Sequence, residues 1–377
     1  MNDEEYRAAS MDVVYLAACA VNGIVPDAAR VEMMDLNRLY KAADRHLLTG
    51  ITAMALESVR VKDEMFTQAK GKAIRKVLAF DVERSAVLAK LEDAGIWYMP
   101  LKGSVLKSLY PKLGMRQMSD NDILYDACKT PEVRTIMEGL GFFTDSSFGQ
   151  GIHDQYYKLP VCNFEMHRSL FASGHEKRFV DYYQDVKSRL ILDEGSRYGY
   201  HFSDEDFYIY MLCHEYKHFF GAGTGLRSML DIYVYLKKKS GAMDWSYISD
   251  EMEKLGISDF EAQNRSLAMH LFDGEALTIQ DQKILDYIIS SGTYGTFQNR
   301  VQNRARKYGN GSWGKLKYIF SRLFLPMDVV RARFPLFIKC PILLPFLPAY
   351  RILRGLTIQR NTVRAELKAL VTRKKQP

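Results

Sequence analysis

The sequence predicts an α+β protein in which helical regions flank a small mixed-sheet core. The first observation is a series of three short apolar segments, at 96–102, 119–126 and within 157–170, which alternate with helical patterns. The second is the recurrence of apolar residues at three- and four-residue spacing over 4–92 and again after residue 202. We therefore expect the sheet in the middle of the chain, with helices before and after it.

The helical pattern before the first expected strand ends at Gly95, and a new helix is expected to begin at Gly103. Residues 130–142 also have the pattern of a helix, with Thr130 as its N-cap and Pro131 at its first position. The expected order of elements is therefore strand, helix, strand, helix, strand. That order is typical of a small α/β core.

The chain beyond this core is expected to be mainly helical. Ser203 precedes an acidic first turn and is the expected N-cap of a helix that extends to about residue 220. Four regions follow from these patterns. They are an N-terminal helical region (1–75), the core (76–192), a helical domain (193–300) and a basic, proline-containing extension (301–377).

Composition points to a packed protein in a reducing compartment. Hydrophobic residues make up 47% of the 377 residues and charged residues 26%, as in globular proteins. The five cysteines are scattered, which disfavours both a disulfide framework and a cysteine zinc site. The acidic N-terminus lacks the features of a signal peptide, and no run of about 20 uncharged apolar residues predicts a membrane span. We therefore expect a cytoplasmic protein.

Charge is distributed unevenly along the chain. Residues 301–377 contain 17 Lys or Arg and only two acids, Asp328 and Glu366, which gives a net charge of +15 in a chain whose total is +7. The rest of the chain is therefore mildly acidic. A basic extension of this kind predicts a contact with an anionic membrane surface, a nucleic acid or another polyanion such as a glycan. A peripheral location at the inner membrane surface would be one form of that contact.

The apolar segment 334–356 contains Pro335, Pro341, Pro345 and Pro348. Four prolines in this window exclude a regular membrane-spanning helix. Two structures stay open for it. The first and expected one is a packed extended segment, and the second is a monotopic contact with a membrane surface, assisted by the basic residues nearby.

The segment HEYKH, from His214 to His218, fits the pattern H-E-x-x-H. In that pattern two histidines one helical turn apart hold zinc, and the glutamate acts as base. Such a site needs a third protein ligand, and the nearest downstream acid is Asp231. A zinc hydrolase is therefore one functional hypothesis, although this short pattern also arises by chance. The alternative is a helix whose polar face borders another site.

A candidate phosphate site lies where the first expected strand ends. Lys102 closes that strand, and Gly103 and Ser104 open the following helix. A helix N-terminus with a glycine backbone and a serine hydroxyl suits an anion such as a nucleotide phosphate. The alternative for this pair is an ordinary turn, and for Lys102 it is a side chain that points to solvent.

Three acidic residues follow on the next expected strands. Asp120 and Asp122 are two residues apart, so on a strand both carboxylates leave the same face. Side by side and buried they would be costly, and a divalent cation such as Mg²⁺ relieves that cost. On the third strand Glu165 and His167 share a face. We expect Glu165 to complete a second metal site and to help deprotonate an attacking hydroxyl, whereas His167 is either a ligand or a structural histidine.

These segments resemble a known family. The Gly-Ser turn, the Asp-x-Asp pair and a third acid on a later strand are similar to the nucleotidyltransferase superfamily of the polymerase-beta type. More narrowly, the segments LKGSVL, LYPKLGMRQMSDNDIL, FEMHRSL, HEYKHFF and GLRSMLDIYVYL resemble the bacterial family of uncharacterised nucleotidyltransferases. The resemblance extends over roughly residues 30–240 and makes 76–192 the expected nucleotidyltransferase core.

The resemblance implies an Mg²⁺-dependent transferase. An acceptor that it does not identify, expected to be a hydroxyl, would attack the α-phosphate of a nucleoside triphosphate, with ATP as the default, and pyrophosphate would leave. Two Mg²⁺ ions would be held by Asp120, Asp122 and Glu165, the expected catalytic residues. The residues expected to bind the nucleotide are Lys102, Gly103, Ser104, Arg116, Lys217, His218, Arg227 and Asp231. For the last four of these, the alternative is a set of hydrogen bonds and ion pairs between domains.

Two features depart from the superfamily pattern. The gap from Ser104 to Asp120 is longer than in the small antibiotic-modifying members, and Asn121 stands between the two acids where an aliphatic residue is usual. The second departure puts the packing of that strand in doubt. A non-catalytic nucleotide-binding or interaction module on the same fold is the alternative function, and tight nucleotide binding without turnover would distinguish it.

Overall fold

The computed structural model describes residues 1–144, 149, 151–309 and 311–371, with the side chains at 328, 332 and 333 left out. The chain forms two compact units. The first, here called the body, consists of Met1–Lys217 and Gly225–Ile289. The second, here called the tail unit, consists of His218–Thr224 and Ser290–Pro377. The four narrower regions expected from the sequence stay a prediction, and residues 372–377 of the expected extension lie outside the described residues.

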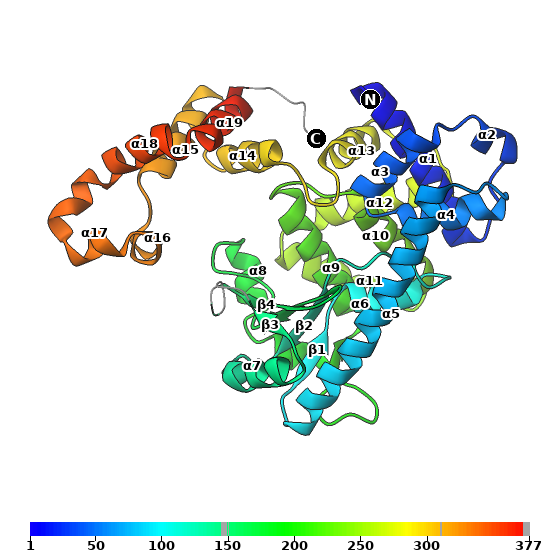
Figure 1. The fold of residues 1–377 in the computed structure, drawn as a ribbon, viewed down its shortest axis with the longest axis horizontal. Helices are drawn as coiled ribbons and strands as arrows, with labels where there is room; N and C mark the ends of the chain where they lie inside the picture. Colours follow the sequence, from blue (N-terminus) through cyan, green and yellow to red (C-terminus); the bar gives the residue numbers. More distant parts are fainter. Residues whose placement is uncertain (145–148, 150, 310, 372–377) are drawn as a thin grey trace. The chain divides into compact units, whose positions relative to one another are not determined.

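The body contains a five-stranded mixed sheet of order β1-β2-β5-β4-β3, which confirms the predicted α+β class (Figure 1). Its strands are β1 (Tyr98–Pro100), β2 (Asn121–Tyr125), β3 (Phe143–Thr144), β4 (His153–Lys158) and β5 (Cys162–His167). β2 and β5 pair in parallel, and the other neighbours pair antiparallel. A separate hairpin joins β6 (Leu190–Leu192) to β7 (Tyr200–Phe202).

The three predicted strands are confirmed as β1, β2 and β5, but the sequence patterns did not reveal β3 and β4. β4 escaped because Asp154, a residue type that is depleted in strands, occupies one of its inward positions. Asp154 is buried and forms an ion pair with Arg168. The buried acid is therefore compensated by a partner that the sequence pattern does not reveal.

One face of the sheet is covered by α5 (Glu64–Asp93) and α7 (Thr130–Gly139). Phe80 of α5 and Met137 of α7 are fully buried in one apolar cluster with Phe164 of β5. Since side chains alternate along a strand, residues of β5 on either side of Phe164 face away from this cluster. Apolar packing on one face thus fixes which side chains β2 and β5 present on the other.

Asn121, the polar residue between the two expected catalytic acids, is fully buried. Its Nδ2 donates a hydrogen bond to the carbonyl of Phe80 at 3.3 Å, and Arg84 Nη1 donates to its Oδ1 at 3.1 Å. Both partners lie on α5. The departure from an aliphatic residue is therefore satisfied by hydrogen bonds to the helix that covers this face.

Helices make up the rest of the body. Before the sheet come α1 (Asp3–Asn22), α2 (Ala28–Glu32), α3 (Leu36–Arg45) and α4 (Thr49–Ser58). Short helices between the strands are α6 (Gly103–Leu106), η1 (Lys107–Leu109), η2 (Ala127–Lys129), α8 (Lys177–Tyr182) and η3 (Val186–Arg189). After the sheet come α9 (Asp204–Phe219), α10 (Leu226–Lys239), α11 (Trp245–Lys254), α12 (Ser258–Asp273) and α13 (Ile279–Ser291).

The expected helix starts are confirmed with one correction. α6 begins at Gly103, as predicted. The hydroxyl of Ser203 accepts a hydrogen bond from the amide of Asp206 at 3.1 Å, which is the expected N-cap contact of α9. Thr130, however, is the first residue of α7 rather than its cap, because its hydroxyl donates to the carbonyl of Ala127 and η2 leads directly into the helix.

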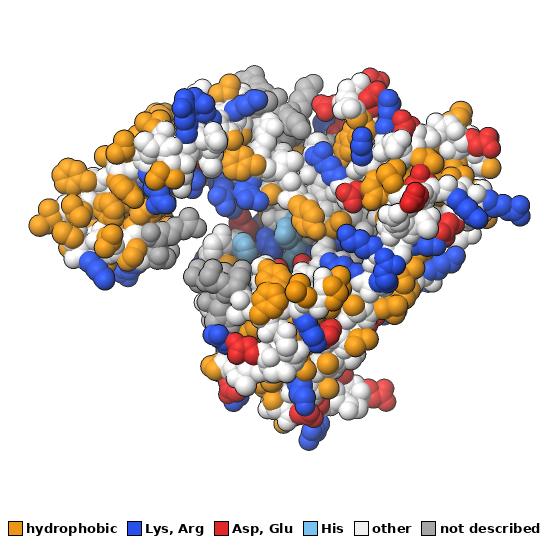
Figure 2. Space-filling view, viewed as in Figure 1, with side chains coloured by type: hydrophobic (Ala, Val, Ile, Leu, Met, Phe, Trp, Pro, Cys, Tyr) orange, Lys and Arg blue, Asp and Glu red, His pale blue; other side chains and the backbone are white. Residues whose placement is uncertain are grey.

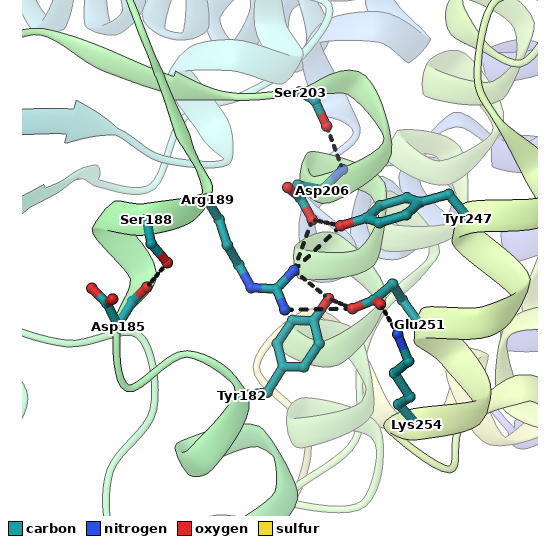
Figure 3. A network of polar contacts seen from close by, with 9 residues as sticks. All are labelled: Tyr182, Asp185, Ser188, Arg189, Ser203, Asp206, Tyr247, Glu251 and Lys254. Carbon is teal, nitrogen blue, oxygen red and sulfur yellow. Dashed lines mark hydrogen bonds and ion pairs between the residues drawn. The ribbon is translucent and has the colours of Figure 1, made fainter.

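Arg189, in η3, fixes the first turn of α9 relative to α11 (Figure 3). Its Nη1 donates to the hydroxyl of Tyr182 at 2.9 Å and approaches Asp206 Oδ1 of α9 at 3.5 Å. Tyr247 of α11 donates to the same carboxylate oxygen at 2.9 Å, and Arg189 Nη2 approaches Glu251 Oε2 at 3.5 Å. Because α9 also carries His214 and Lys217, this network helps to set the direction in which their side chains project.

The tail unit is helical and includes α14 (Phe297–Arg306), α15 (Ser312–Leu323), α16 (Met327–Arg333), α17 (Pro335–Lys339), η4 (Pro341–Phe346), α18 (Leu347–Thr357) and α19 (Arg360–Val371). The expected packed extended segment at 334–356 is therefore wrong, because three of its four prolines stand in the first turns of helices and Pro345 lies inside η4. Pro335 and Pro348 occupy the first turns of α17 and α18, where proline removes no intrahelical hydrogen bond. Over the described part of the chain, every helix is too short or too polar to cross a membrane.

Candidate functional site

The register between β2 and β5 brings the predicted acids together. Asp122 of β2 is the direct partner of Glu165 on the parallel strand β5, and Asp120 directly precedes β2. Each of these three residues offers a carboxylate oxygen, and the three oxygens lie within 4.8 Å of one another. Residues separated by more than 40 positions in the sequence therefore form one acidic group, here called the carboxylate group.

The negative charges of the carboxylate group repel one another. Burial, together with the negative charges of Asp122 and Glu165, raises the pKa of Asp120 to about 7, against an ordinary value of 3.8. The nearby cations Arg227 and Lys102 oppose the rise but do not cancel it. A positive charge placed among the three oxygens would relieve this repulsion.

His167 partly supplies that positive charge. Its Nε2 is 3.2 Å from Asp122 Oδ1 and 3.6 Å from Glu165 Oε2. Burial lowers the pKa of His167, but the two carboxylates outweigh it and raise the pKa to about 9. In return, the hydrogen bond from His167 overcomes the burial of Asp122 and lowers the pKa of that carboxyl. An ionised His167 thus keeps Asp122 ionised.

β4 adds two residues that the sequence analysis did not single out, His153 and Gln155. Gln155 is the register partner of Glu165, and its Nε2 donates to Glu165 Oε1 at 3.1 Å. His153 is the register partner of His167, and its Nε2 is 3.6 Å from Glu165 Oε2. His153, Glu165 and His167 also meet the distance criterion for a group that could hold a metal. The alternation of HDQYYK was the only signal in the sequence, and the acid within it obscured the strand.

Lys102 adopts a strained backbone beside the carboxylate group. Its φ is 33°, in the left-handed region that non-glycine residues rarely occupy. Its Nζ lies 2.5 Å from Nδ1 of His214 on α9. Burial lowers the pKa of Lys102 to about 8, the charge of Lys217 adds to this effect, and Asp122 opposes it. The ammonium of Lys102 therefore interacts with the acids. The alternative in which this side chain points to solvent does not apply.

Lys217 of α9 is the second half-buried cation of the site. Burial lowers its pKa, and the charges of Asp122 and Glu165 raise it. Its Nζ lies 5.9 Å from the centre of the Phe171 ring. α9 therefore brings an ammonium from the second half of the body to the acids of β2 and β5.

Gly103 and Ser104 form the expected turn after β1, but their immediate contacts are local. The hydroxyl of Ser104 donates to the carbonyl of Leu101 at 2.9 Å. A Cβ at Gly103 would lie 2.9 Å from Cε of Met118 and 3.0 Å from Nη1 of Arg116. The turn thus packs closely against the side chains of Met118 and Arg116. Its contact with a phosphate stays a prediction.

Arg116 and Asp231, both predicted to contact the nucleotide, bind each other in a buried pair. Arg116 Nε donates to Asp231 Oδ1 at 2.8 Å, and Nη2 donates to Oδ2 at 2.9 Å. The hydroxyl of Tyr110 donates to the same carboxylate at 2.7 Å. The pair joins α10 to the loop that leads to β2, directly beside Gly103. Its visible role is to hold that turn, and direct nucleotide contact by either residue stays a prediction.

Arg227 lies at the start of α10 and reaches the segment before Asp120. Its Nη1 donates to the carbonyl of Gln117 at 3.1 Å and to the hydroxyl of Ser119 at 3.2 Å. Its charge lowers the pKa of Asp120 against the stronger effect of burial and the neighbouring acids. His218 belongs to the tail unit, and its predicted contact is untested.

The zinc hypothesis gains no support from the described residues. Within them, neither His214 nor His218 belongs to a group of three possible ligands. His214 lies against the ammonium of Lys102, a neighbour that repels a metal cation. Asp231, the nearest downstream acid, is held by Arg116 and Tyr110.

Sequence comparison gives an independent result for the same segments. The model of a protein family described as "Uncharacterised nucleotidyltransferase" matches residues 32–273, which is more than half of the chain. The matched range contains all five strands of the sheet together with α9 and α10. No curated protein and no solved structure matches this chain.

Proposed function

The chain belongs to this family of uncharacterised nucleotidyltransferases, and from that premise we propose that it is an Mg²⁺-dependent enzyme. It transfers a nucleoside monophosphate from a nucleoside triphosphate to an acceptor hydroxyl and releases pyrophosphate. ATP is the proposed donor. The acceptor is a sugar, an antibiotic, a protein side chain or an RNA end.

The observation that carries the proposal is the carboxylate group of Asp120, Asp122 and Glu165 with two half-buried cations, Lys102 and Lys217, beside it. Carboxylates within 4.8 Å of one another suit a divalent cation, and the ammonium groups of Lys102 and Lys217 suit phosphate oxygens. Burial lowers the pKa of both lysines, which shows that placing their ammonium groups here costs free energy. An acidic cluster with a purely structural role would not require that cost. Together the two sets match the parts of a nucleotide–metal complex.

The donor set fits Mg²⁺ on two grounds. All three ligands are oxygens, which this hard cation prefers. The raised pKa of Asp120 also reports unrelieved negative charge at the point where the three carboxylates meet. When bound there, Mg²⁺ neutralises charge on the transferred phosphoryl group and helps to align the attacking and leaving oxygens.

The protein's own residues then bind and orient the triphosphate. Lys102 and Lys217 contact its phosphate oxygens, and the turn at Gly103 approaches them with its backbone. The pair Arg116–Asp231 packs against that turn and holds it in place. His167 keeps Asp122 ionised through its hydrogen bond and therefore keeps the carboxylate group ready for a cation.

The reaction forms one bond and breaks one. The acceptor oxygen attacks the α-phosphorus, and the electron pair of the bond between the α-phosphorus and its bridging oxygen leaves with pyrophosphate. The acceptor's proton passes to Glu165. Burial lowers the pKa of the neighbouring His153, whose Nε2 lies 3.6 Å from Glu165 Oε2.

Label transfer from α-labelled ATP with Mg²⁺ to a panel of acceptors tests the proposal. We expect the Asp120→Ala/Asp122→Ala variant to lose transfer by at least about 1,000-fold, because both ligands are removed. A matched control replaces two exposed acids of α11, Asp250→Ala/Glu253→Ala, and should keep wild-type transfer. If the site variant transfers label as well as the control, the assignment fails.

Tight nucleotide binding provides the second readout. A protein that binds ATP through Lys102 and Lys217 but transfers no label to any acceptor in the panel would be a non-catalytic nucleotide-binding module. Isothermal titration with ATP, with and without Mg²⁺, distinguishes that result from a chain that binds no nucleotide.

A further inference from the structure

We propose that the tail unit docks on the surface of an anionic lipid bilayer, with its apolar helices inserted at the interface. The proposal rests on residues of the tail unit alone and is independent of the transfer reaction. It is carried by three features, which are apolar side chains turned outwards, an excess of cations around them and an open apolar pocket.

The first feature is the reversed orientation of α18. Gly355 is buried, and a Cβ there would lie 3.2 Å from Val363 of α19, so the small residue forms the packed side of the helix. Leu353 and Leu356 are instead each 63% exposed. A helix in water places leucine inwards and polar residues outwards. α18 has the opposite arrangement over this face.

The outward apolar surface continues over the segments next to α18. Leu336 of α17, Ile342 and Phe346 of η4, and Ile358 after α18 are 62% to 80% exposed. Figure 2 shows hydrophobic side chains gathered over the segment from α16 to α18, with basic side chains near them. Contiguous apolar surface of this kind marks an interaction site in a soluble protein.

The second feature, the excess of cations, indicates which kind of partner fits this surface. The segment 301–377 carries a net charge of +15, and exposed cations such as Lys317, Arg360 and Arg364 stand on the helices α15 and α19. An anionic bilayer offers negative headgroups above an apolar layer, so it satisfies both kinds of side chain at once. Nucleic acid would satisfy the cations but not the leucines. A second copy of the tail unit would satisfy the leucines but would bring two strongly positive surfaces together.

The third feature is a pocket of about 210 Å³ between α15, α18 and α19. Leu323, Ile352, Leu356 and Leu367 line it, and Arg322, Arg351 and Glu366 also border it, with Arg322 Nε and Glu366 Oε1 paired at 2.9 Å. The apolar lining of this pocket suits the acyl chain of a lipid. The docking is interfacial, since every described helix is too short or too polar to span a bilayer.

The test is co-sedimentation of the full-length protein with vesicles. We expect binding to vesicles of phosphatidylcholine and phosphatidylserine in equal amounts, and little binding to phosphatidylcholine alone. Leu353→Ser/Leu356→Ser should lower the partition coefficient by about tenfold, because two side chains leave the interface. Arg360→Gln/Arg364→Gln should lower it by about fivefold for each charge removed, with a smaller salt dependence.

A matched control tests whether any pair of exposed aliphatic residues promotes vesicle binding, or only the pair in the tail unit. Leu78 and Val82 are also exposed aliphatic residues one helical turn apart, but they lie on α5 of the body. Leu78→Ser/Val82→Ser should bind vesicles as wild type does. Far-ultraviolet circular dichroism checks that each variant keeps its helices.

Three results would overturn the proposal. One is equal binding to both kinds of vesicle or to neither. Another is tighter binding to single-stranded RNA than to anionic vesicles, with no effect of the leucine substitutions on the RNA, which would identify a nucleic-acid surface. The third is a concentration-dependent dimer that the leucine substitutions dissociate while vesicle binding is absent. Each can occur whether or not the protein transfers nucleotides.

Discussion

The body and the tail unit use apolar residues in opposite ways. In the body, α5 and α7 pack apolar side chains such as Phe80 and Met137 against the sheet in one continuous cluster, with Phe80 and Phe164 fully enclosed. Among the described residues of the tail unit, a smaller buried cluster is formed by Val301, Ala305, Tyr318, Ala369 and Leu370. Large aliphatic residues of α17, η4 and α18 remain outside it.

The body and the tail unit also differ in how they place their charged side chains. The body buries its charges as pairs or brings them together at the site, as with Arg116–Asp231 and the carboxylate group. The tail unit displays cations with few acids among them. This difference is the one that the proposed docking of the tail unit on an anionic bilayer requires. Chemistry and attachment would then be properties of separate units, which four kinds of variant can examine.

The largest expected effect is on the stability of the body. Asp231→Asn leaves the guanidinium of Arg116 buried without a counter-charge, so the free energy of unfolding should fall by about 3–5 kcal/mol. Urea denaturation followed by fluorescence measures it. Glu138→Gln, which removes the exposed partner of Arg134 on α7, should leave stability nearly unchanged because solvent screens that pair. Equal losses in the two variants would show that the buried pair has no special role.

The next effect separates chemistry from attachment. Lys217→Met removes an ammonium that interacts with Asp122 and Glu165, and kcat/KM for label transfer should fall by about 100-fold. Lys217→Arg keeps a cation and should retain more of the activity. Vesicle binding should be the same in all three proteins. A Met variant with wild-type transfer would remove Lys217 from the proposed site.

Acid should affect the body through His46, which is fully buried. Its Nδ1 accepts a hydrogen bond from the amide of Leu226 at 3.1 Å, and its Nε2 lies 3.0 Å from the hydroxyl of Tyr6. Burial lowers the pKa of His46 from 6.5 to about 3, so the unfolded chain takes up a proton that the folded protein resists. The stabilising contribution is therefore complete above pH 6.5 and is lost as the pH falls from that value towards 3.

The measurement is the free energy of unfolding of wild type and His46→Gln across this range. Wild type should lose up to about 1.4 kcal/mol more per pH unit than the variant. Asp120 contributes with the opposite sign, since its folded pKa of about 7 exceeds 3.8, and the difference between the two proteins cancels that contribution. Residues 290–377 contain no histidine, so vesicle binding should not follow this slope. Parallel slopes in the two proteins would contradict the prediction.

The smallest expected effect concerns the apolar surface of α18. Because Leu353 and Leu356 are exposed, Leu353→Ser/Leu356→Ser should change the free energy of unfolding by less than about 0.5 kcal/mol. Leu370→Ala, within the buried cluster of the same unit, should cost about 2–5 kcal/mol. Thermal unfolding of the three proteins compares them. A large loss on replacing the outer leucines would mean that they stabilise the tail unit rather than serve a partner.

Patterns of short range were sufficient for much of the fold. The alternation in CNFEMH placed Glu165 and His167 on one face, and the structure has that arrangement in β5. The cap at Ser203 and the helix start at Gly103 were readable because each depends on neighbouring residues. β4 was not readable, because the partner that compensates its buried Asp154 lies on another segment.

The site shows the same division. The sequence alone identified Asp120, Asp122 and Glu165 as one chemical set and separated a basic extension from an acidic body. Only the tertiary structure decided that Arg116 and Asp231 bind each other, that His153 and Gln155 stand beside Glu165, and that α18 turns leucine outwards. The reason is physical. Spacing along the chain determines which face of an element a side chain leaves, but its partner, its burial and therefore its charge state depend on segments that meet only on folding.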